Sequence, residues 1–184
     1  HVVQPTAHGC EAVIGIPAQS GGAGTTNLTV SASTIHNYGK NGITCNGAAT
    51  TCNVSDTSVT GRGPVGLGDA AQNGIQLGFG VTGSVIGCEV HDNNYTPATV
   101  CAAGILLAGA GGVLVQLNVA VGNLCVVPAQ GDGNTLDGNI VDPAGLFPFS
   151  VLGDGNLATR NVVQGSGSDG VYVDGTGNTF TCHR

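Results

Sequence analysis

Positive charge is the scarcest property of this sequence. Its 184 residues include only four lysines and arginines (Lys40, Arg62, Arg160 and Arg184) against 11 acidic residues, which gives a net charge of −7. A protein that binds the phosphate backbone of DNA or RNA needs a basic surface to displace counterions. The sequence therefore argues against a nucleic-acid partner.

Helix-forming residues and long apolar runs are scarce as well. Methionine and tryptophan are absent, and glutamate, lysine and arginine are few, whereas the chain holds 33 glycines and seven prolines. This composition suits short strands and many turns, and no capped stripe of apolar residues with helical spacing occurs. No apolar run approaches the roughly 20 residues of a membrane span, and no signal-peptide pattern stands at the start. We expect an all-β, soluble, mature protein without a membrane span.

Cysteine, in contrast, is frequent. Seven cysteines in so uncharged a chain suggest an oxidising compartment, and hence a secreted or extracellular protein, although buried free thiols are the alternative. Cys45 and Cys52 flank a short loop and are the first pair that we expect to form a disulfide. The odd number leaves at least one thiol free or paired between chains. No Cys-x-x-Cys spacing indicates a zinc site.

Repetition is the main positive feature. Phrases that begin at Asn134, Asn156 and Asn178 return every 22 residues, separated by Gly-Asp-Gly or Asp-Gly-Thr-Gly turns. A fixed period near 20 indicates a solenoid, and the two short alternating runs in each copy indicate strands. We predict six to seven rungs of roughly 21–30 residues over 29–184. Residues 1–28 are expected to form an irregular segment that covers the first rung.

Stacked rungs place equivalent residues in columns about 4.8 Å apart, and strand alternation decides which columns point inward. Three columns are expected to form the core, while Thr44, Gln76, Leu106, Cys125, Ser150 and Tyr172 face out. The inward columns are Ile35, Val59, Val90, Val119, Ile140 and Val162; Ile43, Ile75, Ile105, Leu124, Phe149 and Val171; and Cys45, Leu77, Leu107, Val126, Val151 and Val173.

Asparagine recurs at one position of the later rungs. Amides stacked at strand spacing hydrogen-bond along the stack and tolerate bent backbone conformations. We favour a structural role for them, because a repeat fold needs the same corner in each rung. The alignment places Asn118, Asn139 and Asn161 in one column with Thr34, Ser58 and Glu89.

The phrases Asn134-Thr-Leu-Asp-Gly-Asn-Ile-Val and Ser168-Asp-Gly-Val-Tyr-Val-Asp-Gly-Thr-Gly-Asn resemble the repeat of right-handed parallel β-helix proteins, the superfamily that includes pectate lyases, polygalacturonases and alginate-modifying enzymes. Ala71-Gln-Asn-Gly-Ile-Gln is similar to the second-strand phrase of secreted bacterial members. The resemblance covers about 29–184 and implies a single-stranded right-handed parallel β-helix. It implies an activity only weakly, because one fold serves many functions.

Two long connections, 61–72 and 93–103, mark the face where chemistry is expected, since insertions in solenoids gather on one face that is often the binding face. A carboxylate, an imidazole and a cation in one groove could recognise a sugar acid or remove a proton beside a carboxylate. Solvated loop residues are the alternative interpretation. The candidates are His36, Lys40, Arg62, His91 and Asp92 for catalysis, and Asp69, Tyr95 and Gln76 for substrate binding.

His36 and His91 are expected in one column with Thr60 between them, which places them about 9.6 Å apart and too far to share a metal ion. A lyase of the pectate type would need a calcium cluster and a cationic base, for which only Lys40 and Arg62 are available. The paired aspartates and Gly-His-Gly of polygalacturonases and the Asp-Pro-His-Glu phrase of alginate epimerases are absent. No complete motif decides whether the protein is an enzyme.

No cofactor is certain from the sequence. Asp132 and Asp154 lie in equivalent Gly-Asp-Gly turns, so weak Ca²⁺ binding is one interpretation. The other, which we favour, is that aspartate suits the turn.

Two functions remain open at this point. The first is a secreted β-helix protein that binds or acts on a polysaccharide through the loop-lined face of the early rungs. The second is a structural protein that self-associates through the open ends of its coil, because a final rung leaves an unpaired strand edge. Ice binding is disfavoured, since the outward column is irregular.

Overall fold

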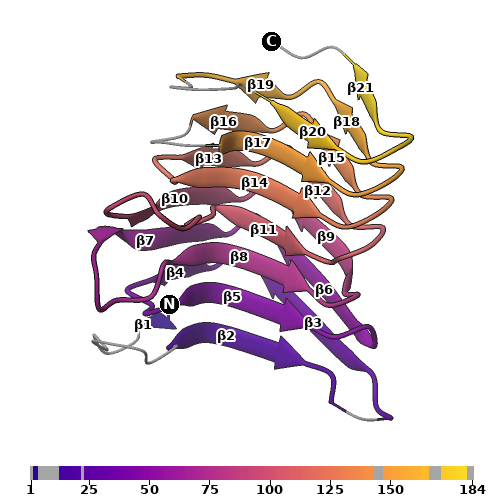
Figure 1. Ribbon diagram of the computed structural model, residues 1–184. Coiled ribbons are helices and arrows are strands. Elements are labelled where there is room, and N and C mark those ends of the chain that lie inside the picture. The colour runs from indigo at the N-terminus through magenta and orange to yellow at the C-terminus, as the bar shows by residue number, and fades with distance from the viewer. Residues whose placement is uncertain (1, 4–12, 22, 143–146, 166–170, 182–184) are drawn as a thin grey trace.

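The computed structural model describes residues 2–3, 13–21, 23–142, 147–165 and 171–181, which form strands and no helix (Figure 1). These ranges accordingly contain no helix that could span a membrane. Three parallel sheets of seven strands surround one interior, so the coil has seven rungs. In Figure 1 the chain runs from left to right along the front, returns behind and rises, which makes the coil right-handed. The predicted right-handed parallel β-helix is confirmed.

We name the sheets A, B and C in the order in which the chain passes through them. Sheet A contains β1 (Val2–Val3), β4 (Thr34–His36), β7 (Ser58–Val65), β10 (Glu89–Tyr95), β13 (Val119–Val121), β16 (Ile140–Asp142) and β19 (Val162–Val163). Sheet B contains β2 (Ile14–Gln19), β5 (Asn41–Asn46), β8 (Asn73–Gly78), β11 (Ile105–Ala108), β14 (Cys125–Gln130), β17 (Phe147–Leu152) and β20 (Tyr172–Asp174). Sheet C contains β3 (Thr26–Ser31), β6 (Thr50–Ser55), β9 (Thr82–Ile86), β12 (Leu114–Gln116), β15 (Thr135–Asp137), β18 (Leu157–Thr159) and β21 (Thr179–Thr181).

Each rung therefore has three strands, whereas the sequence indicated two runs per repeat. The phrase from Asn134 holds two of them, because β15 ends at Asp137, the chain turns at Gly138 and β16 begins at Ile140. The turning residue has a positive φ, between 46° and 64°, in six successive rungs. A single left-handed residue bends the backbone sharply between two extended stretches. These corner residues between sheets C and A are Ala32, Asp56, Gly87, Leu117, Gly138 and Arg160.

The predicted inward column of sheet A is wrong by one residue from its fifth strand, β13, onward. Val119 pairs with Glu89 and not with Val90, so it lies on the outer face, and Ile140 is 40% exposed. Backbone pairing requires the next residue of each of these strands to point inward. The inward column is Ile35, Val59, Val90, Ala120, Val141 and Val163.

The error arises because Asn118 belongs to the corner and not to the strand. The Asn118 Oδ1 atom accepts a hydrogen bond from the Cys88 amide at 2.9 Å, which places Asn118 beside Cys88, one residue before Glu89. An alignment by polarity put Asn118 next to Glu89 and moved every later rung by one position.

The inward columns of sheet B agree with the sequence except in the fifth rung, which holds β14. There Ala129 pairs with Leu107 in place of the predicted Val126, and Val127, in place of Leu124, pairs with Phe149. Leu124 precedes β14 and packs in a separate small cluster, while Cys125, predicted to face solvent, forms a disulfide. Glycine directly precedes the aligned isoleucine in the three rungs before it, as in Gly42-Ile43, whereas no glycine precedes Val127, which hid the start of β14 in the sequence.

The first rung is more regular than expected. The predicted boundary between residues 28 and 29 lies inside β3, and β2 pairs in register with β5 from Ile14 to Gln19. A proline at position 17 lowers the strand propensity of this segment, but an edge strand tolerates proline.

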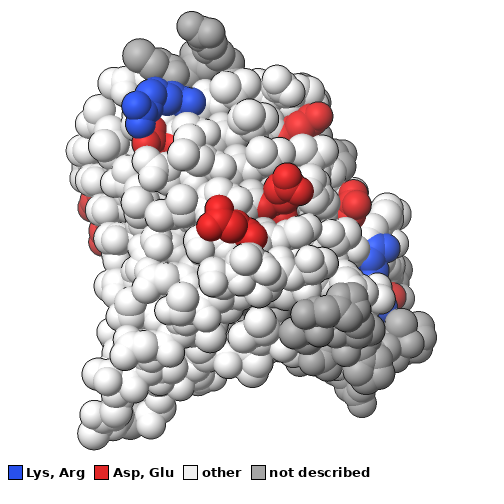
Figure 2. Space-filling model, turned by 180° about the vertical axis from the view of Figure 1, so that it is seen from behind, with Lys and Arg blue, Asp and Glu red and all other residues white. Residues whose placement is uncertain are grey.

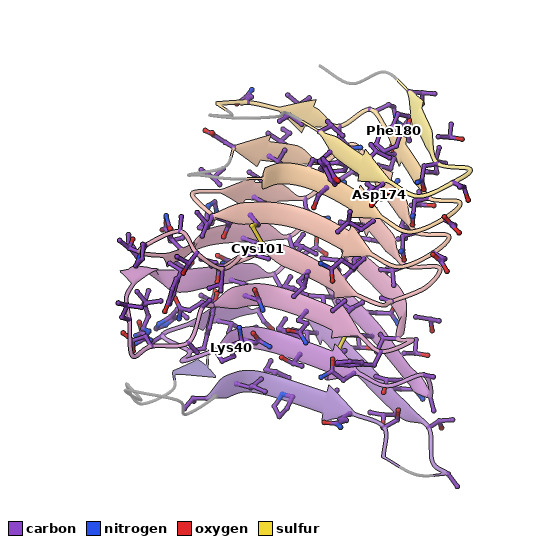
Figure 3. All side chains as sticks on the ribbon, in the orientation of Figure 1. Lys40, Cys101, Asp174 and Phe180 are labelled. Atoms are coloured by element: carbon purple, nitrogen blue, oxygen red, sulfur yellow. A yellow bond between two sulfur atoms is a disulfide. The ribbon has the colours of Figure 1, made fainter. Side chains whose placement is uncertain are left out.

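Two disulfides lie within the described residues, one between strands β5 and β6 and one between a connection and β14. The predicted bond between Cys45 and Cys52 is present, and a second joins Cys101 to Cys125, visible beside the Cys101 label in Figure 3. Cys88 is a buried free thiol, and burial raises its pKa. The remaining cysteines lie outside the described residues.

Candidate functional site

The outer face of sheet A carries two parallel columns of side chains. The predicted column of His36, Thr60 and His91 is confirmed by the strand register. Beside it the register places hydroxyl and carboxylate residues in the early rungs and aliphatic residues in the later ones. This second column is Thr34, Ser58, Glu89, Val119, Ile140 and Val162.

A hollow of about 390 Å³ lies at the corner between sheets C and A, across three consecutive rungs. It exists because two of the corner residues there are small: Ala32 has only a methyl group and Gly87 has no side chain. In the fourth rung the corner residue is Leu117, whose side chain lies over Gly138 and is 61% exposed. The hollow, which we call the corner hollow, is lined by Ala32, Ser33, Thr34, Asp56, Thr57, Ser58, Gly87 and Glu89.

Two hydroxyls of the corner hollow hold the corner itself. Ser33 Oγ donates to the Ser31 carbonyl and Thr57 Oγ1 donates to the Ser55 carbonyl, each at 2.8 Å. The hydroxyls of Thr34 and Ser58 and the carboxylates of two exposed acids, Asp56 and Glu89, complete the polar lining. Hydroxyls both donate and accept hydrogen bonds, whereas ionised carboxylates only accept. The lining can therefore bind a ligand rich in hydroxyl or amino groups.

Basic groups are absent from the lining of the corner hollow. Figure 2 shows the molecule from behind, the side opposite the sheet B strands at the front of Figure 1: acidic groups are spread over a mostly uncharged surface, and basic groups lie at its edges. An imidazole does contact the lining: His91 Nε2 lies 3.9 Å from Glu89 Oε2.

The predicted cationic bases lie at the next corner, between sheets A and B, where they hold the long connection 66–72. Lys40 Nζ donates to the Ala71 carbonyl, and burial lowers the pKa of Lys40. Arg62 Nη2 lies 3.5 Å from Asp69 Oδ1, and the Arg62 amide donates to Gln72 Oε1 at 2.9 Å. These contacts give both cations a structural task.

The remaining predicted site residues separate into three places. Asp92 follows His91 at an exposed position with a φ of 58°. Tyr95 is buried in the small cluster with Val65 and Leu124, so its ring cannot stack on a substrate. Gln76 lies on sheet B, where its Oε1 accepts from Asn41 and Asn73 at 3.1 and 3.3 Å. The set proposed from the sequence does not converge in one groove.

The two turn aspartates serve the turns. Asp132 Oδ1 accepts a hydrogen bond from the Asp154 amide at 2.8 Å, and Asp154 Oδ1 accepts one from the Thr176 amide at 2.7 Å. The second bond lowers the pKa of Asp154. Within the described ranges no three His, Cys, Asp or Glu side chains gather as metal ligands. Each carboxylate thus links its turn to the next rung.

Sequence reasoning missed the corner hollow. Asp56, Ser58 and Glu89 carry no motif, and their proximity depends on the left-handed corners of successive rungs. The available signal was a pair of small residues, Ala32 and Gly87, each three residues before an inward residue of sheet A, Ile35 and Val90. That signal becomes readable only once the corners are aligned.

No protein-family model, curated protein or solved structure matches this chain.

Proposed function

We propose that this protein binds a glycan on the outer face of sheet A, with one sugar unit in the corner hollow, and that it does so without cleaving the chain. The hollow carries this proposal. Its volume of about 390 Å³ falls in the range of small-ligand sites, and its hydroxyls and carboxylates suit the hydroxyl groups of a sugar. The outer columns of sheet A, which begin at the hollow, give an extended polymer room to continue.

Binding is favoured over catalysis by the positions of the acid–base candidates. A general acid or base must lie within hydrogen-bond reach of the proton that it transfers, so two such groups that act on one bond must lie close together. His36 and His91 are two rungs apart, about 9.6 Å by the strand spacing. Lys40 and Arg62 are engaged with Ala71 and Asp69 at another corner.

Calorimetry with soluble oligosaccharides of several classes tests the proposal. We expect heat of binding with at least one class, and at least a tenfold loss of affinity in Ser58→Leu, whose larger side chain fills the hollow. Thr179→Leu, on the exposed face of sheet C, is the matched control and should bind as the wild type does. Binding by Ser58→Leu at wild-type affinity, or no heat with any glycan, would overturn the proposal.

Product analysis tests the non-catalytic part. The same oligosaccharides, incubated with the protein, should yield neither new reducing ends nor unsaturated products that absorb near 235 nm. Release of either product by the wild type, and not by Ser58→Leu, would show that the hollow is an active site.

Assembly through the coil ends is the second candidate, and one observation favours it. Val173 belongs to an inward column but is 42% exposed, because within the described residues β20 pairs only with β17. Sedimentation at rising concentration should then show oligomers that Val173→Asp abolishes. Wild-type protein that remains monomeric at every concentration rules this candidate out.

A further inference from the structure

We infer that the glycan unit held in the corner hollow carries a positive charge, as an amino sugar with a free amine does. This inference rests on the proposed function and adds a ligand class to it. It starts from the two carboxylates of the lining, Asp56 and Glu89, which lie on successive rungs and share the hollow with no lysine or arginine.

The lysine and arginine side chains that the structure describes are engaged elsewhere, while the His91 imidazole lies 3.9 Å from Glu89. Arg160 donates to both carboxylate oxygens of Asp137, Arg62 lies 3.5 Å from Asp69, and Lys40 donates to a backbone carbonyl. The protein therefore does not neutralise the carboxylates of the hollow with its own described lysine or arginine side chains. Two carboxylates that share a site repel one another, and a cation between them relieves the repulsion.

An ammonium group matches this lining in its hydrogen bonds. It has three N–H donors and no acceptor, and carboxylates accept such charge-assisted bonds at short distance. The hydroxyls of Thr34 and Ser58 remain for the neighbouring sugar hydroxyls. A sugar acid would bring a third negative charge against a chain whose net charge is already −7.

A bare metal ion fits less well than a sugar. Calcium takes six to eight oxygen ligands in a close shell, whereas the hollow offers two carboxylates across an open volume of about 390 Å³. Shape and charge together select a cationic molecule of the size of a sugar ring.

Matched hexasaccharides test the inference: one of glucosamine, one of N-acetylglucosamine, which differs only by the acetyl group that removes the charge, and one of a uronic acid. We expect the glucosamine hexamer to bind at least tenfold more tightly than the acetylated one, and the uronic acid hexamer to bind most weakly. Glu89→Gln and Asp56→Asn should each bring the ratio of the first two affinities towards one. Added salt should also reduce the ratio.

Asp174→Asn supplies the control for general attraction to an acidic protein. Asp174 is exposed on β20, in sheet B, as Figure 3 shows, so its loss removes one negative charge without touching the hollow. Its ratio of affinities should equal that of the wild type. A fall as large as that of Glu89→Gln would mean that long-range attraction alone favours the amine, and would overturn the inference.

The remaining outcomes separate this inference from the proposed function. Equal affinity for the acetylated and free hexamers, lost in Ser58→Leu, overturns the charge assignment and leaves glycan binding in place. Heat with CaCl₂ alone that Glu89→Gln abolishes identifies a metal site and overturns the charge assignment. No heat with any hexamer overturns both.

Discussion

Buried asparagines close the corner between sheets C and A in the later rungs. Asn139 is at the centre of this ladder: its Nδ2 donates to Asn161 Oδ1 at 2.8 Å and to the Val115 carbonyl at 3.0 Å, and its Oδ1 accepts from the Asn118 amide at 3.1 Å. Backbone groups bent away from the sheets at the corner thereby find partners inside the coil. The ladder explains why amides recur at the rung period.

Replacing Asn139 by alanine should be costly. The substitution leaves the Val115 carbonyl and the Asn118 amide buried without partners, and each such group costs roughly 1–3 kcal/mol, so we expect a loss of about 3 kcal/mol in denaturant titrations. Asn53→Ala is the control, because Asn53 is exposed and its Oδ1 accepts a hydrogen bond from Ser84 Oγ at 3.0 Å on the outer surface. A loss no greater than that of the control contradicts a structural ladder.

Asp137 gives the fold a dependence on acid. Arg160 Nε donates to Asp137 Oδ1 and Gln116 Nε2 to Oδ2, each at 2.8 Å, and the bonds from Arg160 first, then Gln116, lower the pKa of this carboxyl below its ordinary 3.8. A carboxyl whose pKa is lower in the folded state stabilises the fold fully above pH 3.8. The stabilisation disappears as the pH falls through the folded-state pKa.

The corresponding measurement compares the wild type with Asp137→Asn from pH 7 downward. The wild type should be the more stable of the two at neutral pH, and the difference in unfolding free energy should shrink below about pH 4. Arg160→Gln should show the same convergence. A constant difference across the whole range would mean that the ion pair does not set the pKa.

The early rungs build the same corner without asparagine, which limited what the sequence could show. Ser33, Thr57 and Cys88 each donate from the side chain to the carbonyl two residues earlier. A hydroxyl or thiol satisfies one backbone group, whereas an asparagine also bonds to the next rung. Equivalent corner positions therefore carry different residue types, serine, threonine or cysteine in the early rungs and asparagine in the later ones. The predicted register is wrong from the point where asparagine first replaces them.

At the scale of elements, the long strands β7 and β10 extend beyond the rest of sheet A. A bulge after His91 resets their pairing, which then continues from Asn93 with Gly63 to Tyr95 with Val65. The extension covers the small cluster around Leu124, apart from the main core. The sequence predicted these connections as loops. A bulge interrupts the regular alternation of inward and outward residues, so the sequence did not show that the strands continue beyond it.

The disulfide between Cys101 and Cys125 fastens this extension. It closes a separation of 24 residues, for which chain entropy predicts about 3 kcal/mol of stabilisation. We expect Cys101→Ala with Cys125→Ala to lose that amount and to be cut by proteases within 96–103. The double alanine variant of Cys45 and Cys52, with a separation of seven residues, should lose less and keep that connection intact. Equal cleavage in both variants contradicts the fastening role.

The presence of the strands and the positions of the turns could be predicted from the sequence, and the reason is physical. The Gly-Asp-Gly turns repeat because the carboxylate of one turn accepts a hydrogen bond from the next turn. In sheet B, inward and outward residues alternate regularly along each strand, so the inward residues Ile43, Ile75 and Ile105 align. Corner conformations were not readable, because Ala32, Leu117 and Arg160 adopt positive φ where sequence rules expect glycine or asparagine. The corner hollow follows from those conformations and was missed with them.

At the scale of the whole molecule, each rung touches only its neighbours. Stability in such a stack is a sum of rung and interface terms, so a terminal rung has one interface and a central rung has two. At the C-terminal end, Figure 3 shows Phe180 on the last strand, β21, where it packs on the inner core but stays partly exposed. The aromatic ring partly covers an end that has no further rung in the described chain.

Hydrogen exchange should follow this order. Amides of β20 and β21 should exchange fastest among the strands, and those of β8 and β11 slowest, because opening a central rung breaks two interfaces. Mass spectrometry of peptides from a labelling series measures it. Uniform protection from end to end would mean that the coil opens as a single unit.

The N-terminal edge of sheet B is less receptive to another strand than the C-terminal one. The Ser20 amide donates a hydrogen bond to the Asn46 carbonyl and therefore points towards β5. Amides of successive strand residues point in opposite directions. The backbone nitrogen of Pro17 therefore lies on the other edge of β2, which no described strand pairs with. A proline there removes one donor that an added strand would need. Assembly by the coil ends therefore has one weakened partner.

The corner between sheets A and B accepts connections of very different length, and the strands on both sides still pair in parallel. The stacked rungs and the connections are therefore structurally independent. The amide ladders and aliphatic columns set the spacing of the rungs, and the connection at this corner can vary in length and sequence. A foreign peptide grafted within 66–70 would be presented beside a rigid, patterned wall, which makes the molecule a natural display scaffold.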